Sequence, residues 1–299
     1  MMLHYFHGDQ PNFGDDLNPW LWSRLLPGTF DQDGSSLFVG IGTLLNDSLP
    51  RAQRTVVFGS GVGYGHGLPR VDASWRIYAL RGPLSAKALH VPERLAVTDG
   101  AMLIGRWAPR NRHALRYRYA FMPHVAHANA VWELICREIG FSYIDPGRPV
   151  EEVLAAVGDT EVLLTEAMHG AIVADVLRVP WVPVHTGRGV LAFKWEDWCR
   201  SMGVAYQPHH LPSSLMPVWP YRPHSGIIAP VRHWVKTRLV AAALRRMAGS
   251  AHPSLSDAAC LARRVEQLEQ ALGQFRRDLA VGAFAGSGGD ASRAEERHD

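Results

Sequence analysis

Cysteine is scarce in this sequence. The 299 residues include three, Cys136, Cys199 and Cys260, which lie far apart and form no Cys-x-x-Cys pair. A disulfide framework or a structural zinc site needs more cysteines, or cysteines at closer spacing. The sequence therefore indicates neither kind of site, and we expect no bound metal.

Long hydrophobic runs are also lacking. No apolar stretch approaches the ~18 residues that a membrane-spanning helix needs. The first residues, Met1 to Asp9, contain neither the basic segment nor the apolar segment of a signal peptide. We therefore expect a cytoplasmic protein.

A strong charge bias is missing as well. The chain has 31 Lys and Arg against 28 Asp and Glu, a net charge of +3 and a pI of about 8.9. This excess is too small to indicate a nucleic-acid partner, although it suits an anionic small substrate. Hydrophobic residues make up 47% of the chain and charged residues 20%. That composition is typical of a folded enzyme with one large or two medium domains.

Short apolar runs alternate with helix-like stretches along residues 1–118, the first predicted domain. A helix is predicted at Asp15–Leu26, with Asp15 near its N-cap. Each apolar run ends in glycine or polar residues rather than a hairpin turn, which favours a parallel sheet covered by helices. The predicted strands are Met2–Phe6, Leu37–Ile41, Thr55–Phe58, Trp75–Leu80 and Leu95–Val97.

The same rhythm restarts in residues 119–225, after a charge-rich stretch at 106–118. The predicted strands are Tyr119–Met122, Phe141–Ile144, Glu161–Thr165 and Trp181–Val184, and the predicted helices are Ala128–Ile139, Val150–Val157, Gly170–Leu177 and Lys194–Met202. We therefore predict an α/β protein of two Rossmann-like domains facing a cleft. In such sheets the ligand is expected at the carboxyl ends of the strands.

A helical extension is predicted at 226–281, followed by a disordered tail at 282–299. The first part of the extension, 231–247, is basic. The second part carries an apolar seam at alternating steps of four and three, formed by Leu261, Val265, Leu268, Leu272, Phe275 and Leu279. Such a seam is typical of a coiled coil. Two interpretations stay open, which are self-association as a homodimer and docking on the chain's own body.

Paired carboxylates, Asp15 and Asp16, follow Asn12 at the start of the first predicted helix. Free amides and the helix dipole stabilise carboxylates at such a position, so helix capping is the simplest interpretation. Two adjacent aspartates nevertheless leave one free to act as a base on a hydroxyl group.

Three further segments stand at predicted strand ends. Gly59, Ser60 and Gly61 belong to a glycine-rich loop whose amides can approach an anion, although a plain turn explains the pattern equally well. Arg81 can grip a carboxylate or phosphate with its planar fork, or it can lie on the surface. His169 is expected in the first turn of a helix, beside N–H groups that favour a bound anion, with Glu166 as an alternative cap of that helix.

Six segments, in their order along the chain, resemble the polysaccharide pyruvyl transferase family. They are Asn12–Leu17, Gly40–Gly42, Phe58–Val62, Leu80–Pro83, Asp99–Ala101 and Met168–Ile172. The likeness covers roughly residues 3–205 and is greatest to the branch of succinoglycan and xanthan ketal-pyruvate transferases. It implies a fold similar to the two-domain GT-B glycosyltransferases. It also implies transfer of a pyruvyl group from phosphoenolpyruvate to sugar hydroxyls of an exopolysaccharide or its lipid-linked repeat unit, without a cofactor.

When the family's binding residues are carried over by position, the resemblance implies that Arg81 and His169 bind the donor. His169 is also the candidate acid, with Asp15 or Asp16 as the base on the acceptor. The remaining predicted binding residues are Asn12, Gly59, Ser60, Gly61, His124, Glu166 and Lys194. Many family members have an arginine where this chain has Ala167, so the missing charge is expected from Lys194, Arg178, Arg188 or His124.

Other partners and functions complete the set of expectations. Trp20 and Trp22 would offer a sugar-stacking face, although burial is the commoner outcome for tryptophan. The basic stretch at 231–247 would either pack back on the N-terminal domain or hold the enzyme at the inner face of an anionic membrane. A GT-B glycosyltransferase using a nucleotide sugar stays open as an alternative. So does an inactive scaffold of polysaccharide assembly, which the lost arginine and the apolar seam permit.

Overall fold

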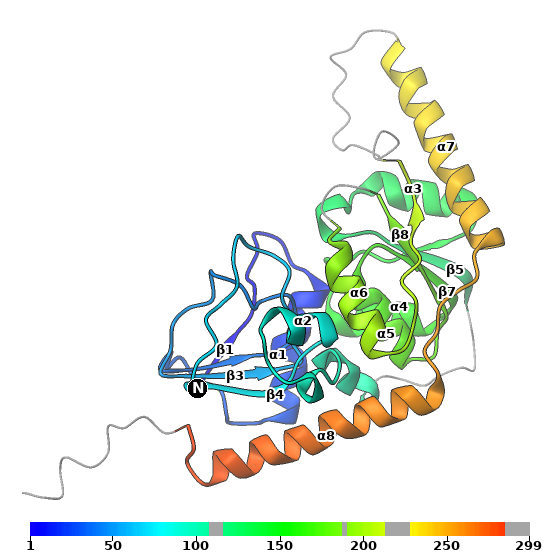
Figure 1. Cartoon of the computed structure of the whole chain (residues 1–299). Helices are drawn as coiled ribbons and strands as arrows, with labels where there is room; N and C mark the ends of the chain where they lie inside the picture. The colour runs from blue at the N-terminus through cyan, green and yellow to red at the C-terminus, as the bar shows by residue number, and fades with distance from the viewer. Residues whose placement is uncertain (108–115, 187–189, 213–227, 285–299) are drawn as a thin grey trace, which may run out of the picture.

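The protein contains two parallel sheets and is described here from a computed structural model (Figure 1). The structure describes residues 1–107, 116–186, 190–212 and 228–284. We call residues 1–107 the N-terminal half and residues 116–212 the C-terminal half. Arg188, residues 213–227 and most of the predicted tail lie outside the described residues.

The N-terminal sheet has four parallel strands in the order β1-β2-β3-β4. Strands β2 and β3 are almost entirely buried, as expected when helices cover both faces of a parallel sheet. The strands are β1 (Met2–His4), β2 (Ser36–Val39), β3 (Arg54–Phe58) and β4 (Trp75–Ala79), and the helices are α1 (Phe13–Leu25) and α2 (Pro83–Ala88).

Two details of this half differ from the sequence-based expectation. The predicted strand at Leu95–Val97 is wrong, because the chain forms a 3-10 turn at η1 (Glu93–Leu95) and only a single bridge from Ala96 to Leu80. The N-cap of α1 is Asn12 rather than Asp15, since the Asn12 side chain accepts a hydrogen bond from the Gly14 amide. A second 3-10 helix, η2 (Gly100–Arg106), follows Asp99.

The C-terminal sheet is also parallel, with the order β6-β5-β7-β8-β9. Its first strand begins before the predicted domain boundary at 118. The strands are β5 (Tyr117–Met122), β6 (Ser142–Tyr143), β7 (Thr160–Thr165), β8 (Trp181–His185) and β9 (His209–His210). The helices are η3 (Val125–His127), α3 (Ala130–Ile139), α4 (Val150–Gly158), α5 (Met168–Val176) and α6 (Ala192–Ser201).

The two halves share a hydrophobic core. One cluster of buried side chains joins Phe13 and Leu17 of α1 to Val153 of α4 and Ile172 of α5. Helix α2 contacts α6, and α5 contacts η2, so several helices of each half form the junction. This junction lies beside the carboxyl ends of strands from both sheets, which is where an open α/β sheet binds its ligand.

Two long helices form the extension, and each packs on a different half (Figure 1). Helix α7 (Ile228–Ser250) packs on α3, and α8 (Ala258–Ala280) packs on β4 and η2. The basic stretch therefore docks on the C-terminal half, whereas the sequence-based alternative placed it on the N-terminal half. No helix within the described ranges has the length and apolar character needed to cross a bilayer.

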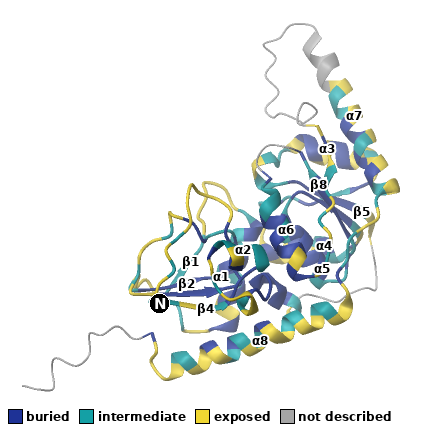
Figure 2. Ribbon diagram, viewed as in Figure 1, coloured by how far each residue is buried: buried dark blue, intermediate teal, exposed yellow. Residues whose placement is uncertain are grey.

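The apolar seam of α8 is used within the chain. Leu268, Leu272 and Phe275 are buried, while the outer side of the helix is exposed (Figure 2). The Phe275 ring lies 5.3 Å from the ring centroids of both Phe38 and Tyr78. Of the two interpretations left open, the structure supports docking of the seam on the chain's own body. The predicted disordered tail at 282–299 is wrong at its start, because Phe284 is buried with its ring 5.6 Å from that of Phe275.

Candidate active site

The amino ends of α1 and α5 meet at the junction of the two halves. Asn12 caps α1 and donates from Nδ2 to Oδ2 of Asp15 at 2.6 Å. The His169 side chain, in the first turn of α5, lies directly against Gly14. A Cβ atom on Gly14 would stand 2.3 Å from His169 Nδ1, so only glycine leaves room for the imidazole. The Asn12–Leu17 and Met168–Ile172 segments thus form one site.

His169 also faces a buried carboxylate. Its Nε2 lies 3.8 Å from Oδ2 of Asp99, which is fully buried. The other oxygen, Oδ1, accepts from the Ala101 amide at 2.9 Å and so caps η2. Neither His169 Nε2 nor Asp99 Oδ2 has a hydrogen-bond partner within the described part of the chain. Since buried polar atoms are normally paired, these two are positioned to receive a ligand or to pair when the imidazole is protonated.

Asp15 connects His169 to a lysine of the C-terminal half. Burial raises the pKa of the Asp15 carboxyl. The hydrogen bond from Asn12 and the charges of His169 and Lys194 act in the opposite direction. Asp15 is thus a partly buried carboxyl group with a raised pKa, and it lies in electrostatic range of His169 and Lys194. This environment suits proton transfer.

Lys194 is a cation inside the junction. Its side chain is 9% exposed, and Nζ donates to the hydroxyl of Tyr64 at 2.9 Å. Burial and the neighbouring charge of Arg81 lower the pKa of Lys194 to about 8, against a smaller opposite effect of Asp15. The ammonium group is therefore mainly protonated near neutral pH. One of its three N–H donors is used by Tyr64, which leaves donors for an anionic ligand.

Glu166, His124 and His127 form a second buried polar group. Glu166 is fully buried, and its Oε2 accepts from the His124 amide at 3.2 Å and lies 3.3 Å from His127 Nδ1. Its Oε1 has no partner among the residues that the structure describes. The alternative in which Glu166 caps α5 is wrong, because no side chain caps this helix and Glu166 accepts from the His124 amide instead.

His124 does not supply the charge that the missing arginine leaves open. Burial, Lys194 and His127 lower the pKa of His124 to about 4, so its imidazole is neutral near neutral pH. Arg178 is engaged elsewhere, donating to the Ser256 carbonyl at 2.7 Å. Among the candidates that can be described, Lys194 is the one whose charge lies near Asp15 and Arg81.

Arg81 is completely buried and held by protein groups. It donates to Asp197 Oδ2 at 3.1 Å, to Thr43 Oγ1 at 2.6 Å and to the Val62 carbonyl at 2.7 Å. It therefore offers no free planar fork in this conformation, and its donor-binding role stays a prediction. The charge of Arg81 still contributes to the site, because it lowers the pKa of Lys194.

The glycine-rich loop is built around Arg81 and η2. A Cβ atom on Gly61 would lie 2.4 Å from Arg81 Cζ, and one on Gly59 would lie 2.2 Å from the Gly100 amide nitrogen. Gly59 also has a φ of +86°, a conformation that favours glycine. Ser60 is buried and donates to the Gly42 carbonyl at 3.0 Å. Close packing thus accounts for these three residues, and their predicted contact with an anion stays a prediction.

Asp197 is a structural residue of the junction that the sequence analysis missed. It lies on α6 and accepts from the amides of Leu84 and Ser85 at 2.8 and 3.0 Å, so it caps α2 of the other half. Gly82 leaves space for it, since a Cβ atom there would lie 2.0 Å from the Asp197 carbonyl oxygen. The signal in the sequence was indirect, because a buried arginine before an uncapped helix needs a carboxylate from elsewhere.

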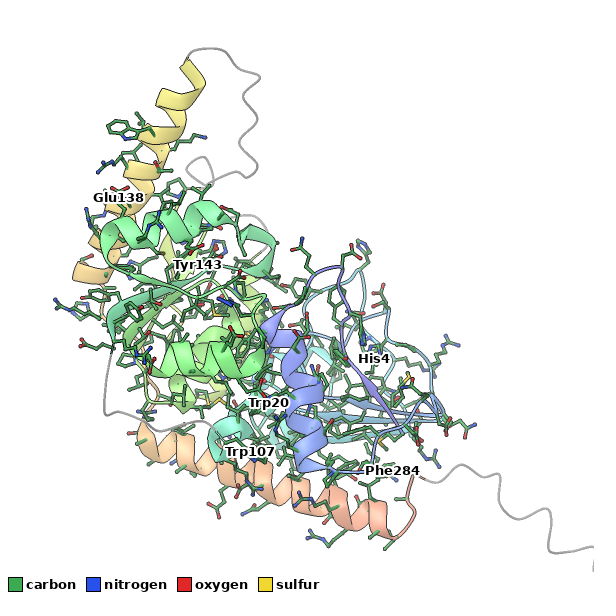
Figure 3. The ribbon with its side chains drawn as sticks, turned by 180° about the vertical axis from the view of Figure 1, so that it is seen from behind. His4, Trp20, Trp107, Glu138, Tyr143 and Phe284 are labelled. Atoms are coloured by element: carbon green, nitrogen blue, oxygen red, sulfur yellow. The ribbon has the colours of Figure 1, made fainter. Side chains whose placement is uncertain are left out.

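The two tryptophans do not form a sugar-binding face. Trp22 is fully buried, with its Nε1 donating to Asn18. The Trp20 ring is covered by Arg24, whose Cζ lies 4.1 Å from the ring centroid, and meets Trp107 edge to face at 6.3 Å (Figure 3). The expectation of a stacking platform on these two residues is therefore wrong.

Similarity to a known protein extends over most of the chain. No family model matches the chain. The chain is 40% identical to the succinoglycan biosynthesis protein ExoV of Rhizobium meliloti (strain 1021) over 218 residues, which are 72% of this chain and 69% of that protein. Identity at this level over this share of both chains implies common ancestry and a common fold.

Proposed function

Because the chain belongs to the polysaccharide pyruvyl transferase family, we propose that it transfers a pyruvyl group from phosphoenolpyruvate to two hydroxyls of one sugar. The sugar belongs to an exopolysaccharide or to its lipid-linked repeat unit. The products are a cyclic pyruvate ketal and inorganic phosphate. The related protein is named for succinoglycan biosynthesis, which supports a polysaccharide acceptor.

The observation that carries this proposal is the cluster of Lys194, His169 and Asp15 at the junction. Phosphoenolpyruvate has a carboxylate and a phosphate, so its site needs convergent positive charge. Lys194 supplies a cation, and the amino end of α5 has no side-chain cap, which leaves its amides for an anion. A two-domain GT-B-like fold would place the donor at this same junction.

The reaction needs an acid and a base. A proton added to the methylene carbon of phosphoenolpyruvate makes the central carbon electrophilic, and a sugar oxygen bonds to that carbon as its hydroxyl proton leaves. The second hydroxyl then displaces phosphate, which takes up the remaining proton. We assign the acid to His169 and the base to Asp15, each contributing roughly 10²–10⁴-fold. Asp99 would stabilise and orient the imidazolium at 3.8 Å.

An assay of which donor the chain uses distinguishes the proposed activity from the two alternatives. A nucleotide-sugar glycosyltransferase would release nucleotide from a sugar donor, and a scaffold would bind no donor. One of the two features that permitted an inactive scaffold is now explained otherwise, because the apolar seam of α8 is buried on the body of the same chain.

The test incubates the purified chain with phosphoenolpyruvate and an oligosaccharide repeat unit freed of ketals by mild acid. We expect release of phosphate that depends on the acceptor, and a pyruvate ketal detected on the product by mass spectrometry. His169→Gln keeps a hydrogen-bonding side chain but cannot exchange a proton in the same way, so it should lose most turnover. Nucleotide release from a nucleotide sugar, with no reaction of phosphoenolpyruvate, would overturn the proposal.

A further inference from the structure

A hollow of about 370 Å³ lies beside Asp15, on the side formed by the loop between β1 and α1. Its walls come from residues 5–12 together with Asp15 and Asp16. Strand β1 ends at His4, so this loop stands at the carboxyl edge of the N-terminal sheet, where α/β proteins bind ligands. The volume is at the lower end of what small-molecule sites have.

Aromatic rings form one part of this hollow. The ring centroids of Tyr5 and His7 are 4.0 Å apart, and the Phe6 side chain is 61% exposed. Gly8 lies close to the Phe6 ring, with its ideal Cβ position 3.1 Å from Cε1. A large aromatic side chain exposed inside a hollow is a typical contact for the apolar face of a ligand ring.

Carboxylates form the other part. Asp9 and Asp16 face the hollow, and within the described chain neither carboxylate makes a hydrogen bond or ion pair. Asp16 and Asp15 lie near the Tyr5 hydroxyl, since both add to the effect of burial in raising the pKa of Tyr5. Unpaired carboxylates are acceptors for several hydroxyl donors.

The charge of the hollow decides which substrate it fits. Its described lining contains three aspartates and no lysine or arginine, so it repels an anionic donor. A neutral sugar has hydroxyls for the carboxylates and C–H faces for the rings. We propose, on the basis of the proposed function, that this hollow is the acceptor subsite and binds the sugar residue that receives the pyruvyl group.

The hollow is placed correctly for this role. Asp15 lines it and is also in electrostatic range of His169 and Lys194. The acceptor therefore reaches the base from one side and the donor reaches the cation from the other. A second hollow of about 360 Å³ shares Gln10 and Pro11 with the first and continues along Tyr143 and Glu133 of the C-terminal half.

The test compares Phe6→Ala and Asp16→Asn with the wild-type chain. The probes are phosphoenolpyruvate, measured by calorimetry, and the ketal-free oligosaccharide repeat unit, measured by saturation-transfer NMR and by steady-state kinetics. We expect each variant to raise the acceptor KM and Kd roughly three- to tenfold while the phosphoenolpyruvate Kd stays unchanged. Tyr117→Ala is the matched control, because Tyr117 is 44% exposed at the opposite, amino end of β5.

The outcomes separate this proposal from the function on which it rests. Normal turnover with an unchanged acceptor KM in both variants would overturn the acceptor subsite and leave the pyruvyl transfer in place. Oligosaccharide binding that both variants weaken, without any binding of phosphoenolpyruvate, would support the subsite and reject the donor.

Discussion

The imidazole of His169 lies between Gly14 on one side and the buried carboxylate of Asp99 on the other. The Nε2 atom is 3.8 Å from Asp99 Oδ2, and neither atom has a hydrogen-bond partner in the described structure. The three residues come from three segments that are far apart in the chain. Their convergence makes Asp99 a positioning residue for the proposed acid.

Asp99→Asn tests this relationship. Asparagine can still accept from the Ala101 amide and cap η2, but it has no charge to stabilise an imidazolium. We expect kcat to fall by roughly tenfold or more, with a phosphoenolpyruvate Kd close to that of the wild type. The measurements are steady-state kinetics and calorimetry.

The double variant of Asp99→Asn and His169→Gln provides the control. If Asp99 acts through His169, the two losses are not additive, and the double variant is about as slow as His169→Gln alone. Additive losses would show that Asp99 acts independently of His169.

Asp197→Asn should strongly destabilise the fold. Asp197 and Arg81 are both fully buried, and their ion pair joins the two halves at 3.1 Å. Removal of one charge from a buried pair leaves the other unpaired and costs about 3–5 kcal/mol. Urea denaturation measures the loss. The control is Glu151→Gln, whose exposed pair with Arg24 contributes about 0–1 kcal/mol. Equal effects of both variants would contradict the structural role of the buried pair.

The buried lysine predicts a pH dependence of donor binding. Lys194 has a pKa of about 8 and binds an anion when it is protonated. Phosphoenolpyruvate affinity should therefore fall as pH rises through that value. Tyr64 does not interfere, because burial raises its pKa above the ordinary 10.0. Calorimetry across this range gives the profile.

Lys194→Met is the control for that profile. The variant should bind the donor weakly at every pH and lose the fall in affinity above about pH 8. A fall that persists in the variant would assign the titration to another group.

Much of the fold could be predicted from the sequence, because local patterns determine it. Apolar runs ending in glycine gave the parallel strands, and the Met168–Ile172 segment correctly placed His169 in the first turn of α5. The Leu95–Val97 strand was wrong, since an apolar run of three residues cannot be distinguished from a turn by its pattern.

The site could be predicted less well, because its contacts join distant segments. Arg81 was predicted to bind an anion or to lie on the surface, whereas it is buried against Asp197, which is 116 residues away and which no local pattern identifies. The glycines of the 59–61 loop were expected to approach an anion, whereas packing against Arg81 and Gly100 accounts for them. The neutral state of His124 depends on burial, which only the folded structure shows.

Phe275→Ala should destabilise the chain without changing its oligomeric state. The ring is fully buried against Phe38 and Tyr78, so truncation leaves a cavity and costs about 3–5 kcal/mol. Gln270→Ala, on the exposed side of α8, is the control and should change stability little.

Light scattering of the full-length protein should give a monomer at micromolar concentration. A dimer that Phe275→Ala dissociates would restore the coiled-coil interpretation.

Helix α7 leads to the last prediction, which concerns anionic membranes. Val240, Ala241, Leu244 and Met247 of this helix are buried, and the helix packs on α3. The opposite side exposes Trp234, Val235 and Leu239, and it carries Arg246, whereas Arg245 donates to the Glu138 carbonyl of α3. The sequence of α7 contains no aspartate or glutamate. An exposed helix face with aromatic, aliphatic and basic residues is typical of binding at a membrane surface.

We therefore expect the chain to sediment with vesicles of anionic phospholipid and not with neutral vesicles. Each basic residue near such a surface contributes about 1 kcal/mol, so Arg246→Gln should weaken binding roughly fivefold. Trp234→Ala should weaken it further by removing apolar contact. Arg263→Gln, on the exposed side of α8, is the matched control and should have no effect. Sedimentation that does not depend on anionic lipid would reject the membrane interpretation of α7, and its exposed apolar residues would then need a protein partner.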